Sequence, residues 1–365
     1  MQEFYISYFD KENEIIKTRF TDIISENNLK KVSNMLPYLY DLYEEAVDII
    51  RNGEINNRYH TFYINKKNGK KRRIDTPDDE LKRYMKKVIW IFTRKFNILF
   101  PKSVYSYIEK RTVKGLASVH REAEVVIKED IKNFFPSCTL KFIINSMNQV
   151  FPFCMMDITI LEVIVKACMV KYKGKYRLPQ GAPTSPILSN ISMIPFDYKV
   201  AVSIAKYGGW EGRCGIQYTR YADDIYISFK KRPYCLERDI LPKIKHTIQQ
   251  ELKDLNSEFI LNEEKEKMVI TSRTNGVWIT GIHININKEI TIGNKAKQKL
   301  KAIIWSFLMD TKNGVHRSKE EIYKMQGIIG HYKYIEPDYV DMIIQKYEEK
   351  TGMDYQKEIR NILCS

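Results

Sequence analysis

The chain has 365 residues, which is too long for one simple core, so we expect two or three subdomains. A content of 44% hydrophobic and 12% aromatic residues excludes a disordered protein, and a net charge of +15 favours a polyanionic partner, nucleic acid first. No apolar run approaches the ~20 residues that span a bilayer, there is no secretory leader, and the six cysteines lack a CxxC pair, so we expect a cytoplasmic protein with no membrane contact and no zinc site.

The first part of the chain, residues 1–60, is rich in charge and is predicted to be helical. Apolar residues recur at helical spacing from Leu36 to Ile50, which predicts one amphipathic helix. In the following stretch, 61–77, two β-prone runs flank a Lys-Asn-Gly-Lys turn, which indicates a hairpin. Its second strand carries a row of basic side chains: Lys70, Lys71, Arg72 and Arg73. Such a row is also typical of a solvated edge strand.

A β-branched run ends in an acid, Asp130, and predicts a strand that presents one carboxylate. The backbone at Ile131 could supply a further oxygen to a metal ion bound there. The block 177–186 is rich in Gly and Pro and opens a predicted helix, with Gly181 where the backbone must come close to another group. Asn190 is predicted on the surface of that helix.

Between Tyr218 and Ser228, two adjacent acids lie among β-prone residues, which predicts strand, tight turn and strand with Asp223 and Asp224 at the turn. Two carboxylates at one tip repel each other unless cations bind, and hard oxygen ligands suit Mg²⁺. Taken alone, the pair is equally well explained as a solvated turn. With Asp130 on a neighbouring strand, the three acids form the pattern of a two-metal phosphoryl-transfer site.

The remaining regular elements follow from apolar periodicity. It predicts helices over 158–170 and 237–255. The stretch 277–286 predicts a strand pair, and 294–365 is helical and basic.

These blocks, in this order, resemble the palm of reverse transcriptases. The likeness runs from about Lys66 to Gly281, and more weakly to about Tyr339. It implies an α+β right-hand polymerase fold with fingers, a palm of antiparallel sheet plus helices, and a short thumb of three helices. The implied limits are 1–60 for an N-terminal helical extension, 61–124 for the fingers, 125–290 for the palm with part of the fingers at 138–185, and 291–365 for the thumb.

The resemblance also implies which side chains hold the nucleotide. The family's fingers hairpin covers the incoming nucleotide with an arginine, matched by Arg72 in the pattern Gly-Lys-x-Arg-x-Ile-x-x-Pro. Gln180 matches a glutamine that touches the sugar, and Phe135 matches an aromatic residue that excludes a 2′-hydroxyl, while Phe134 is predicted to be core. Lys265 ends an Asn-x-x-Lys element and would act near the leaving pyrophosphate as a general acid. The implied nucleotide-binding residues are Arg72, Ile131, Phe135, Gln180 and Gly181.

The resemblance is to an RNA-directed DNA polymerase of the retron and defence-associated type. Asp130, Asp223 and Asp224 would act in catalysis and, with the Ile131 carbonyl, bind two Mg²⁺ ions. Such enzymes copy a structured non-coding RNA, as template and primer, into single-stranded DNA from dNTPs. They act in anti-phage defence with an effector, which we expect to be a separate protein. Whether the chain forms an oligomer is left open.

Two alternatives stay open. Leu116 stands where retron enzymes carry Asn, and Ile279 where they carry Val, which keeps a defence-associated polymerase that makes untemplated or repetitive DNA under consideration. The second alternative is a nucleic-acid-binding scaffold without catalysis. Sequencing the product DNA distinguishes the first alternative from the retron type. The joint change Asp223→Asn with Asp224→Asn tests the second, because a scaffold would keep its biological activity and a polymerase would lose it.

Overall fold

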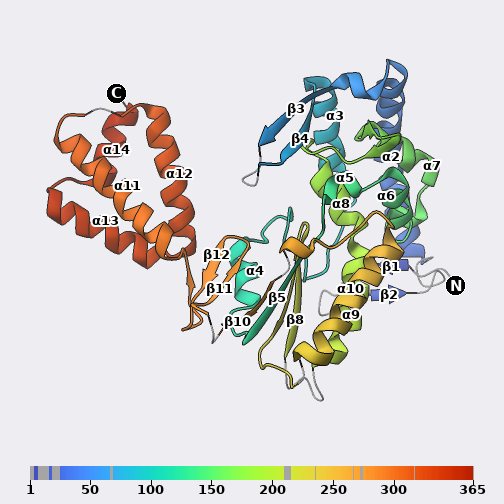
Figure 1. Ribbon diagram of the computed structural model, residues 1–365. Helices are drawn as coiled ribbons and strands as arrows, with labels where there is room; N and C mark the ends of the chain where they lie inside the picture. The colour runs from blue at the N-terminus through green and yellow to red at the C-terminus, as the bar shows by residue number, and fades with distance from the viewer. Residues whose placement is uncertain are drawn as a thin grey trace. The chain divides into compact units, whose positions relative to one another are not determined.

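The computed structural model describes residues 4–6, 16–18, 25–65, 69–208, 215–234, 236–265, 267–271, 274–315 and 317–364 (Figure 1). The chain divides into two compact units. Unit 1 comprises Met1–Arg111 and Ile127–Met268, and unit 2 comprises Thr112–Val126 and Val269–Ser365. The predicted thumb therefore shares its unit with a stretch that the sequence assigns mainly to the fingers. None of the helices in the described ranges is long and apolar enough to cross a membrane.

Unit 1 begins with two short strands, β1 (Phe4–Ile6) and β2 (Ile16–Thr18), which pair antiparallel. The prediction that residues 1–60 are helical is therefore wrong for this part of the chain. The predicted amphipathic helix is confirmed as α2 (Glu26–Arg51). It starts ten residues before its predicted apolar stripe because the Ser25 side chain accepts a backbone N–H and caps it.

The hairpin predicted over 61–77 is confirmed. β3 (Tyr59–Asn65) pairs antiparallel with β4 (Lys71–Pro77) along its whole length. The short η1 (Ile55–Arg58) precedes the hairpin, and α3 (Asp79–Trp90) follows it and continues into the π-helical η2 (Ile91–Lys95). All side chains of β3 after its first residue are exposed, whereas β4 buries Asp75 and Pro77.

A four-stranded sheet carries the three acids. Its strand order is β10, β5, β9, β8, which are the segments Lys267–Ile270, Val125–Asp130, Asp224–Phe229 and Ile216–Tyr221. β8 and β9 form the predicted hairpin, with Tyr221 opposite Asp224. The first three residues of β5 are apolar and buried, as expected of an interior strand.

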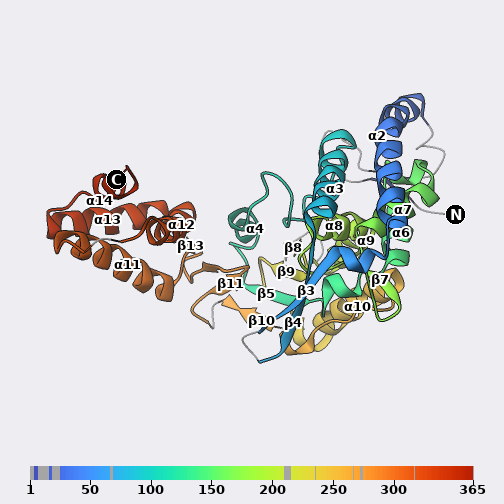
Figure 2. The ribbon, with the colours of Figure 1, turned by 90° about the horizontal axis from the view of Figure 1, so that it is seen from above.

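The other elements of unit 1 are mostly short helices. They are α5 (Phe134–Ser137), α6 (Leu140–Met147), η3 (Phe153–Met155), α7 (Ile158–Ala167), β6 (Val170–Tyr172), β7 (Lys175–Arg177), α8 (Ser185–Ser192), α9 (Ile194–Ala205), η4 (Lys206–Gly208), η6 (Leu236–Ile240), α10 (Leu241–Leu255) and η7 (Glu263–Lys265). The helix predicted over 158–170 ends at Ala167, because Val170 opens a strand. Both ribbon views show α9 and α10 side by side, and α9 packs on β8 (Figure 1 and Figure 2).

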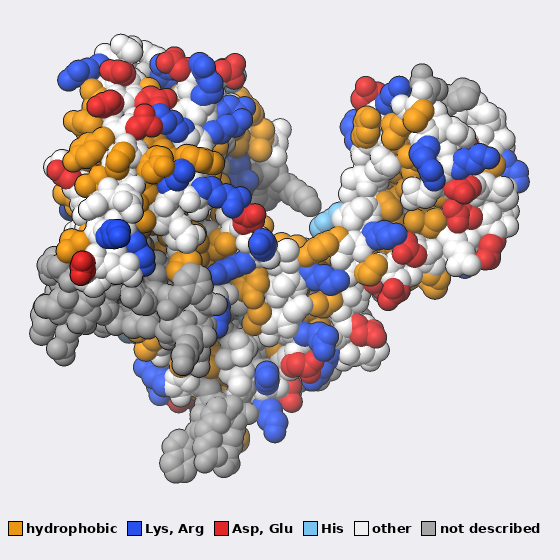
Figure 3. Space-filling model, turned by 180° about the vertical axis from the view of Figure 1, so that it is seen from behind, with side chains coloured by type: hydrophobic (Ala, Val, Ile, Leu, Met, Phe, Trp, Pro, Cys, Tyr) orange, Lys and Arg blue, Asp and Glu red, His pale blue; other side chains and the backbone are white. Residues whose placement is uncertain are grey.

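Unit 2 packs α4 (Val113–Val119) on a three-stranded sheet. The sheet order is β11 (Val277–Ile279), β12 (Ile282–Ile284) and β13 (Ile290–Thr291), which confirms the strand pair predicted over 277–286. Four helices follow, one more than predicted: α11 (Asn294–Lys312), α12 (Lys319–Ile335), α13 (Pro337–Thr351) and α14 (Tyr355–Cys364). On the face shown in Figure 3, acidic side chains lie among the Lys and Arg side chains of these helices.

Candidate active site

The first acid, Asp130, lies at the end of β5 and is 2% exposed. The segment 260–262 runs antiparallel beside it: the Lys132 N–H donates to the Ile260 carbonyl at 2.9 Å, and the Asn262 N–H donates to the Asp130 carbonyl at 2.8 Å. The Asn262 side-chain amide also donates to Asp130 Oδ1 at 3.0 Å. Asn262 begins the Asn-x-x-Lys element and had no predicted role. Because an amide is a neutral donor, it orients the Asp130 carboxylate without cancelling its charge.

The other two acids lie at the tip of the β8–β9 hairpin. There Ala222 has φ +56°, a left-handed conformation that costs a residue with a Cβ about 1–2 kcal/mol. Its N–H donates to Ser106 Oγ at 2.9 Å, and its carbonyl accepts Arg220 Nη1 at 3.0 Å. The Asp223 carbonyl in turn accepts the Ile131 N–H at 2.9 Å. This last bond holds the Asp-Asp turn against the end of β5.

A buried ion pair supports the turn. Arg220 and Asp197 are both 0% exposed and meet in two bonds, Nε to Oδ1 at 2.7 Å and Nη2 to Oδ2 at 2.8 Å. The Tyr218 hydroxyl donates to the same Oδ1 at 2.7 Å. Burial raises the pKa of Tyr218 well above its ordinary value, so the hydroxyl keeps its proton and remains a donor.

The prediction that Asn190 lies on a helix surface is wrong. Asn190 is 0% exposed, and its side-chain oxygen accepts Arg220 Nη1 at 3.2 Å. Its side-chain nitrogen donates to the Ser106 carbonyl at 2.6 Å. Asn190 therefore joins α8 to the segment that holds the Asp-Asp turn. The hydroxyl of Ser185, in the first turn of that helix, donates to the Pro179 carbonyl at 2.7 Å.

Asp224 is paired with a lysine. The Lys128 Nζ lies 2.9 Å from Asp224 Oδ1 and 5.3 Å from the centre of the Tyr226 ring. Lys128 and Asp130 are two residues apart in β5, so their side chains share one face of the strand. Burial lowers the pKa of Lys128 and the Asp224 carboxylate raises it, with a net rise. An ammonium group thus balances one of the three acids.

The three acids come from adjacent backbone segments, but their carboxylates do not form a closed cage. Within the described ranges, no group of three or more His, Cys, Asp or Glu side chains is placed to hold a metal ion. Two of the three carboxylates turn to Asn262 and Lys128. The donor chemistry nevertheless fits a divalent ion, because three carboxylates and the Ile131 carbonyl are hard oxygen ligands at one end of the sheet.

A pocket of about 230 Å³ in unit 1 is lined by both Arg72 and Gln180. Arg72 is exposed at the start of β4, whereas its neighbour Arg73 is bound to the Asp75 carboxylate at 2.8 Å and lies 4.5 Å above the Tyr172 ring. The basic side chains among the described residues of its wall outnumber the acid Asp75: they are Lys71, Arg72, Arg73, Lys173 and Arg177. Such a charge balance suits a polyphosphate.

Gln180 and Gly181 connect this pocket to the fingers hairpin. The Gln180 carbonyl accepts the Asp75 N–H at 2.8 Å. Gly181 has φ +123°, and a Cβ there would lie 3.0 Å from the Asp75 carbonyl oxygen, so the approach of β4 requires a glycine. The side-chain oxygen of Gln180 is buried and has no hydrogen-bond partner among the described residues. A ligand hydroxyl would satisfy it.

The remaining predicted residues are placed as follows. Phe134 is confirmed as core: it is 5% exposed, and its ring lies 5.8 Å from that of Phe259. Phe135 is half-buried beside it, with the two rings 5.7 Å apart. Lys265 ends η7, and its side chain lies outside the part of the chain that the structure describes.

Comparison with known proteins gives a consistent family match. The family described as reverse transcriptase (RNA-dependent DNA polymerase) matches residues 64–319. The chain is 26% identical to the retron Ec83 reverse transcriptase of Escherichia coli, over 85% of this chain and 93% of that protein. It is 29% identical to the retron Ec86 reverse transcriptase of Escherichia coli, over 68% of this chain and 69% of that protein. It is 24% identical to the retron Mx65 reverse transcriptase of Myxococcus xanthus, over 79% of this chain but 64% of that protein.

Among solved structures, the chain is similar to telomerases at low identity. A telomerase of Candida albicans in complex with a TWJ fragment of telomeric RNA matches with a TM-score of 0.43 at 13% identity, over 83% of this chain and 62% of that chain. The apo telomerase of Candida tropicalis matches with a TM-score of 0.45 at 14% identity, over 83% of this chain and 58% of that chain.

Proposed function

Since this chain belongs to the reverse transcriptase family and is therefore an RNA-directed DNA polymerase, we propose that it copies a dedicated, structured non-coding RNA into single-stranded DNA in anti-phage defence. The likeness to retron reverse transcriptases over most of the chain supports this choice of template. RNA is the expected partner of such a polymerase. The proposal includes dNTPs as substrates and a separate effector protein.

One contact carries the proposal that the enzyme is active. The Ile131 N–H donates to the Asp223 carbonyl at 2.9 Å, which ties the backbone next to Asp130 to the Asp-Asp turn. The family's chemistry needs acids from both places to share one site. A scaffold that had lost catalysis would have no use for a left-handed Ala222 held by two buried bonds, since that conformation costs stability.

Divalent metal ions are general to this family, and we propose two Mg²⁺ ions at this site, held by Asp130, Asp223 and the Ile131 carbonyl with Asp224 in support. Bound there, the ions would lower the pKa of the primer hydroxyl and neutralise the triphosphate. Two of these acids already have partners in the protein. The Asn262 amide fixes the Asp130 carboxylate, and Lys128 pairs with the Asp224 carboxylate, for which it competes with a metal ion.

Four side chains are proposed to position the incoming nucleotide. Arg72 presents an always-charged planar fork to the triphosphate from a wall rich in basic groups. The side-chain oxygen of Gln180, which lacks a hydrogen-bond partner among the described residues, would accept a hydrogen bond from the sugar. Phe135 would occupy the space of a 2′-hydroxyl and so select deoxynucleotides, and Lys265 would protonate the leaving pyrophosphate.

Purification of the protein from cells that carry its own locus tests the template. The nucleic acid that copurifies is sequenced, with the joint variant Asp223→Asn and Asp224→Asn alongside. We expect one defined RNA with complementary DNA from the wild type and the same RNA without DNA from the variant. Repetitive or untemplated DNA would contradict the retron-type template. RNA without DNA from both proteins would contradict the polymerase activity itself.

A further inference from the structure

The short helix α5 depends on groups outside itself for its position. It has four residues, which is too few for a helix to be stable alone. Its last two carbonyls are held by side chains from elsewhere in unit 1. The Pro136 carbonyl accepts Arg177 Nη1 at 2.7 Å, and the Ser137 carbonyl accepts the Asn256 side-chain amide at 2.8 Å. Along the chain, Phe135, the proposed contact to the sugar, lies between the predicted metal ligands Asp130 and Ile131 and the two carbonyls that accept these bonds.

Both donors are themselves held by one residue, Glu258, through its carboxylate and its backbone N–H. Arg177 binds both oxygens of Glu258, Nη1 to Oε2 and Nη2 to Oε1. The Glu258 N–H donates to the Asn256 side-chain oxygen at 3.2 Å, which orients the Asn256 amide. Arg177 is 13% exposed and Glu258 is 25% exposed, so water screens their attraction only in part. We name Arg177, Asn256 and Glu258 the α5 clamp.

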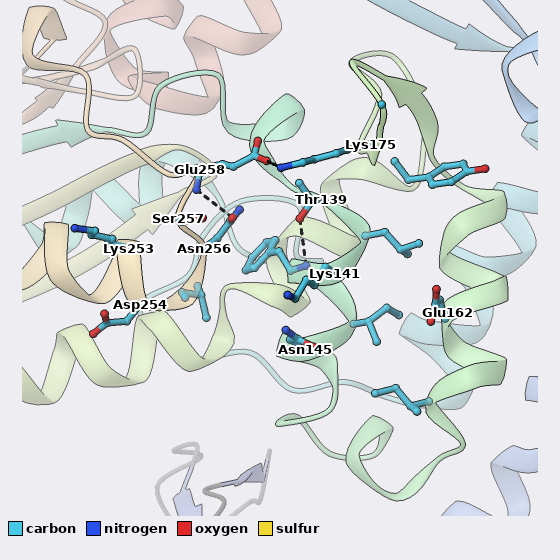
Figure 4. Close-up of a pocket in the computed structure, with 17 residues that line it drawn as sticks. Thr139, Lys141, Asn145, Glu162, Lys175, Lys253, Asp254, Asn256, Ser257 and Glu258 are labelled. Carbon is cyan, nitrogen blue, oxygen red and sulfur yellow. Dashed lines mark hydrogen bonds and ion pairs between the residues drawn. The ribbon is translucent and has the colours of Figure 1, made fainter.

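Figure 4 shows the outer side of the α5 clamp. Glu258 and Asn256 lie on the wall of a cavity of about 880 Å³, with Lys175 reaching toward Glu258 from the start of β7. The Lys175 Nζ lies 2.8 Å from Glu258 Oε1, but this lysine is 61% exposed. The same carboxylate therefore has one partly buried partner, Arg177, and one solvated partner, Lys175. Replacing Glu258 removes the contact to Arg177, whereas replacing Lys175 leaves that contact in place, so the two substitutions form a matched pair.

From these contacts we infer that the α5 clamp is a positioning device that sets the place of Phe135 and hence the discrimination between deoxynucleotides and ribonucleotides. The inference rests on the proposed function. It gives a positioning role to three residues, none of which is a proposed metal ligand. The clamp binds backbone carbonyls of α5, so it holds this helix independently of the side chains that α5 carries.

The packing of Phe134 explains why losing the clamp would shift α5 without unfolding it. Phe134 stays in contact with Phe259, and the Phe259 ring lies 5.0 Å from that of Phe142. These apolar contacts remain when a polar bond is removed. A displacement of about 1 Å at a reacting group is enough to change rates by about 100-fold. A small rotation of α5 would therefore change sugar discrimination while the fold persists.

The test measures the ratio of kcat/KM for a dNTP to that for the matching rNTP in RNA-templated primer extension. Glu258→Ala leaves Arg177 without its bidentate partner, and we expect the ratio to fall by about tenfold. Asn256→Ala removes the other bond and is expected to act in the same direction. Lys175→Met removes only the solvated partner, and the ratio should stay within about twofold of wild type.

Two further measurements decide whether the effect passes through Phe135. Phe135→Ala alone should lower the ratio, and adding Glu258→Ala to it should lower the ratio no further. Amide exchange of α5 and Cys138, whose N–H donates to the Phe134 and Phe135 carbonyls, should be faster in Glu258→Ala than in wild type.

An unchanged ratio in both clamp variants, or an equal fall with and without Phe135, would overturn the clamp and leave the proposed function standing. An unchanged ratio in Phe135→Ala would overturn the sugar contact and the clamp together. If the wild type extends no primer, the proposed function fails, and unchanged amide exchange then overturns the clamp independently.

Discussion

Asp197→Asn tests the buried ion pair that supports the Asp-Asp turn. The change keeps the side-chain volume but removes the negative charge facing Arg220, and both side chains are 0% exposed. A guanidinium does not give up its proton in a protein, so its charge would stay buried and unbalanced. Removing one partner of a buried pair costs about 3–5 kcal/mol. Because the Asn oxygen still accepts one of the two bonds, we expect a loss near the lower end, about 3 kcal/mol.

Urea unfolding at 25 °C, followed by circular dichroism, measures this loss as a change in the free energy of unfolding. The matched control is Asp341→Asn, which breaks the 2.6 Å pair with Lys333 on the surface of unit 2, where both side chains are about half exposed. The control should be indistinguishable from wild type. Primer extension should also slow in Asp197→Asn, because Arg220 Nη1 holds the Ala222 carbonyl. A loss below about 1 kcal/mol, the level of a surface pair, would refute the role given to this ion pair.

Three further changes follow from the same contacts. Lys128→Met removes the ammonium that competes for Asp224 and should lower the Mg²⁺ concentration for half-maximal primer extension; a higher requirement would contradict the geometry. Arg72→Lys replaces a planar fork by a point charge and should raise the KM for dNTP about tenfold with little change in RNA binding, whereas an unchanged KM would remove Arg72 from the nucleotide site. Burial lowers the pKa of His120 to about 4. As the pH falls from about 6.5 toward 4, His120 is therefore protonated in the unfolded chain but not in the folded protein. The free energy of unfolding should then decrease by about 1.4 kcal/mol per pH unit. His120→Gln should flatten the dependence of the unfolding free energy on pH in that window, and an unchanged slope would assign it to other groups.

The position of the acids could be predicted because strand signals are local. β-branched runs and a hairpin turn are properties of a few consecutive residues, and the structure has β5, β8 and β9 where the sequence indicated them. The β3–β4 hairpin followed in the same way from the Asn-Gly pair in its sequence. Phe134 was predicted to be core because Phe135 has the family's offset from Asp130, and Phe134 is buried.

The buried polar residues could not be predicted. Asn190 and Arg220 are polar, and local periodicity places polar residues outside unless their partners are known. Their partners, Ser106 and Asp197, come from other parts of the chain and become visible only in the fold. The pairing of Asn262 with Asp130 was missed for the same reason, although the motif that contains Asn262 was recognised.

The incorrect predictions of element number and type also have identifiable causes. The strands β1 and β2 have three residues each, which is too short for an alternating pattern to appear in a charged segment. The fourth helix of unit 2, α14, lies in a stretch that was predicted to be helical, and the count of three helices came from the family resemblance rather than from the residues. Leu116, which departs from the retron signature, is fully buried in α4 and is explained by packing.

RNA-templated incorporation of a single dNTP is the most direct test of the central claim that Asp130, Asp223 and Asp224 form one metal-dependent polymerase site. The assay compares wild type with Asp223→Asn at equal occupancy of the same RNA template and primer, with and without Mg²⁺. We predict incorporation by the wild type that requires Mg²⁺, and a loss of at least about 100-fold in the variant with RNA binding unchanged. Incorporation by Asp223→Asn at the wild-type rate would contradict the claim.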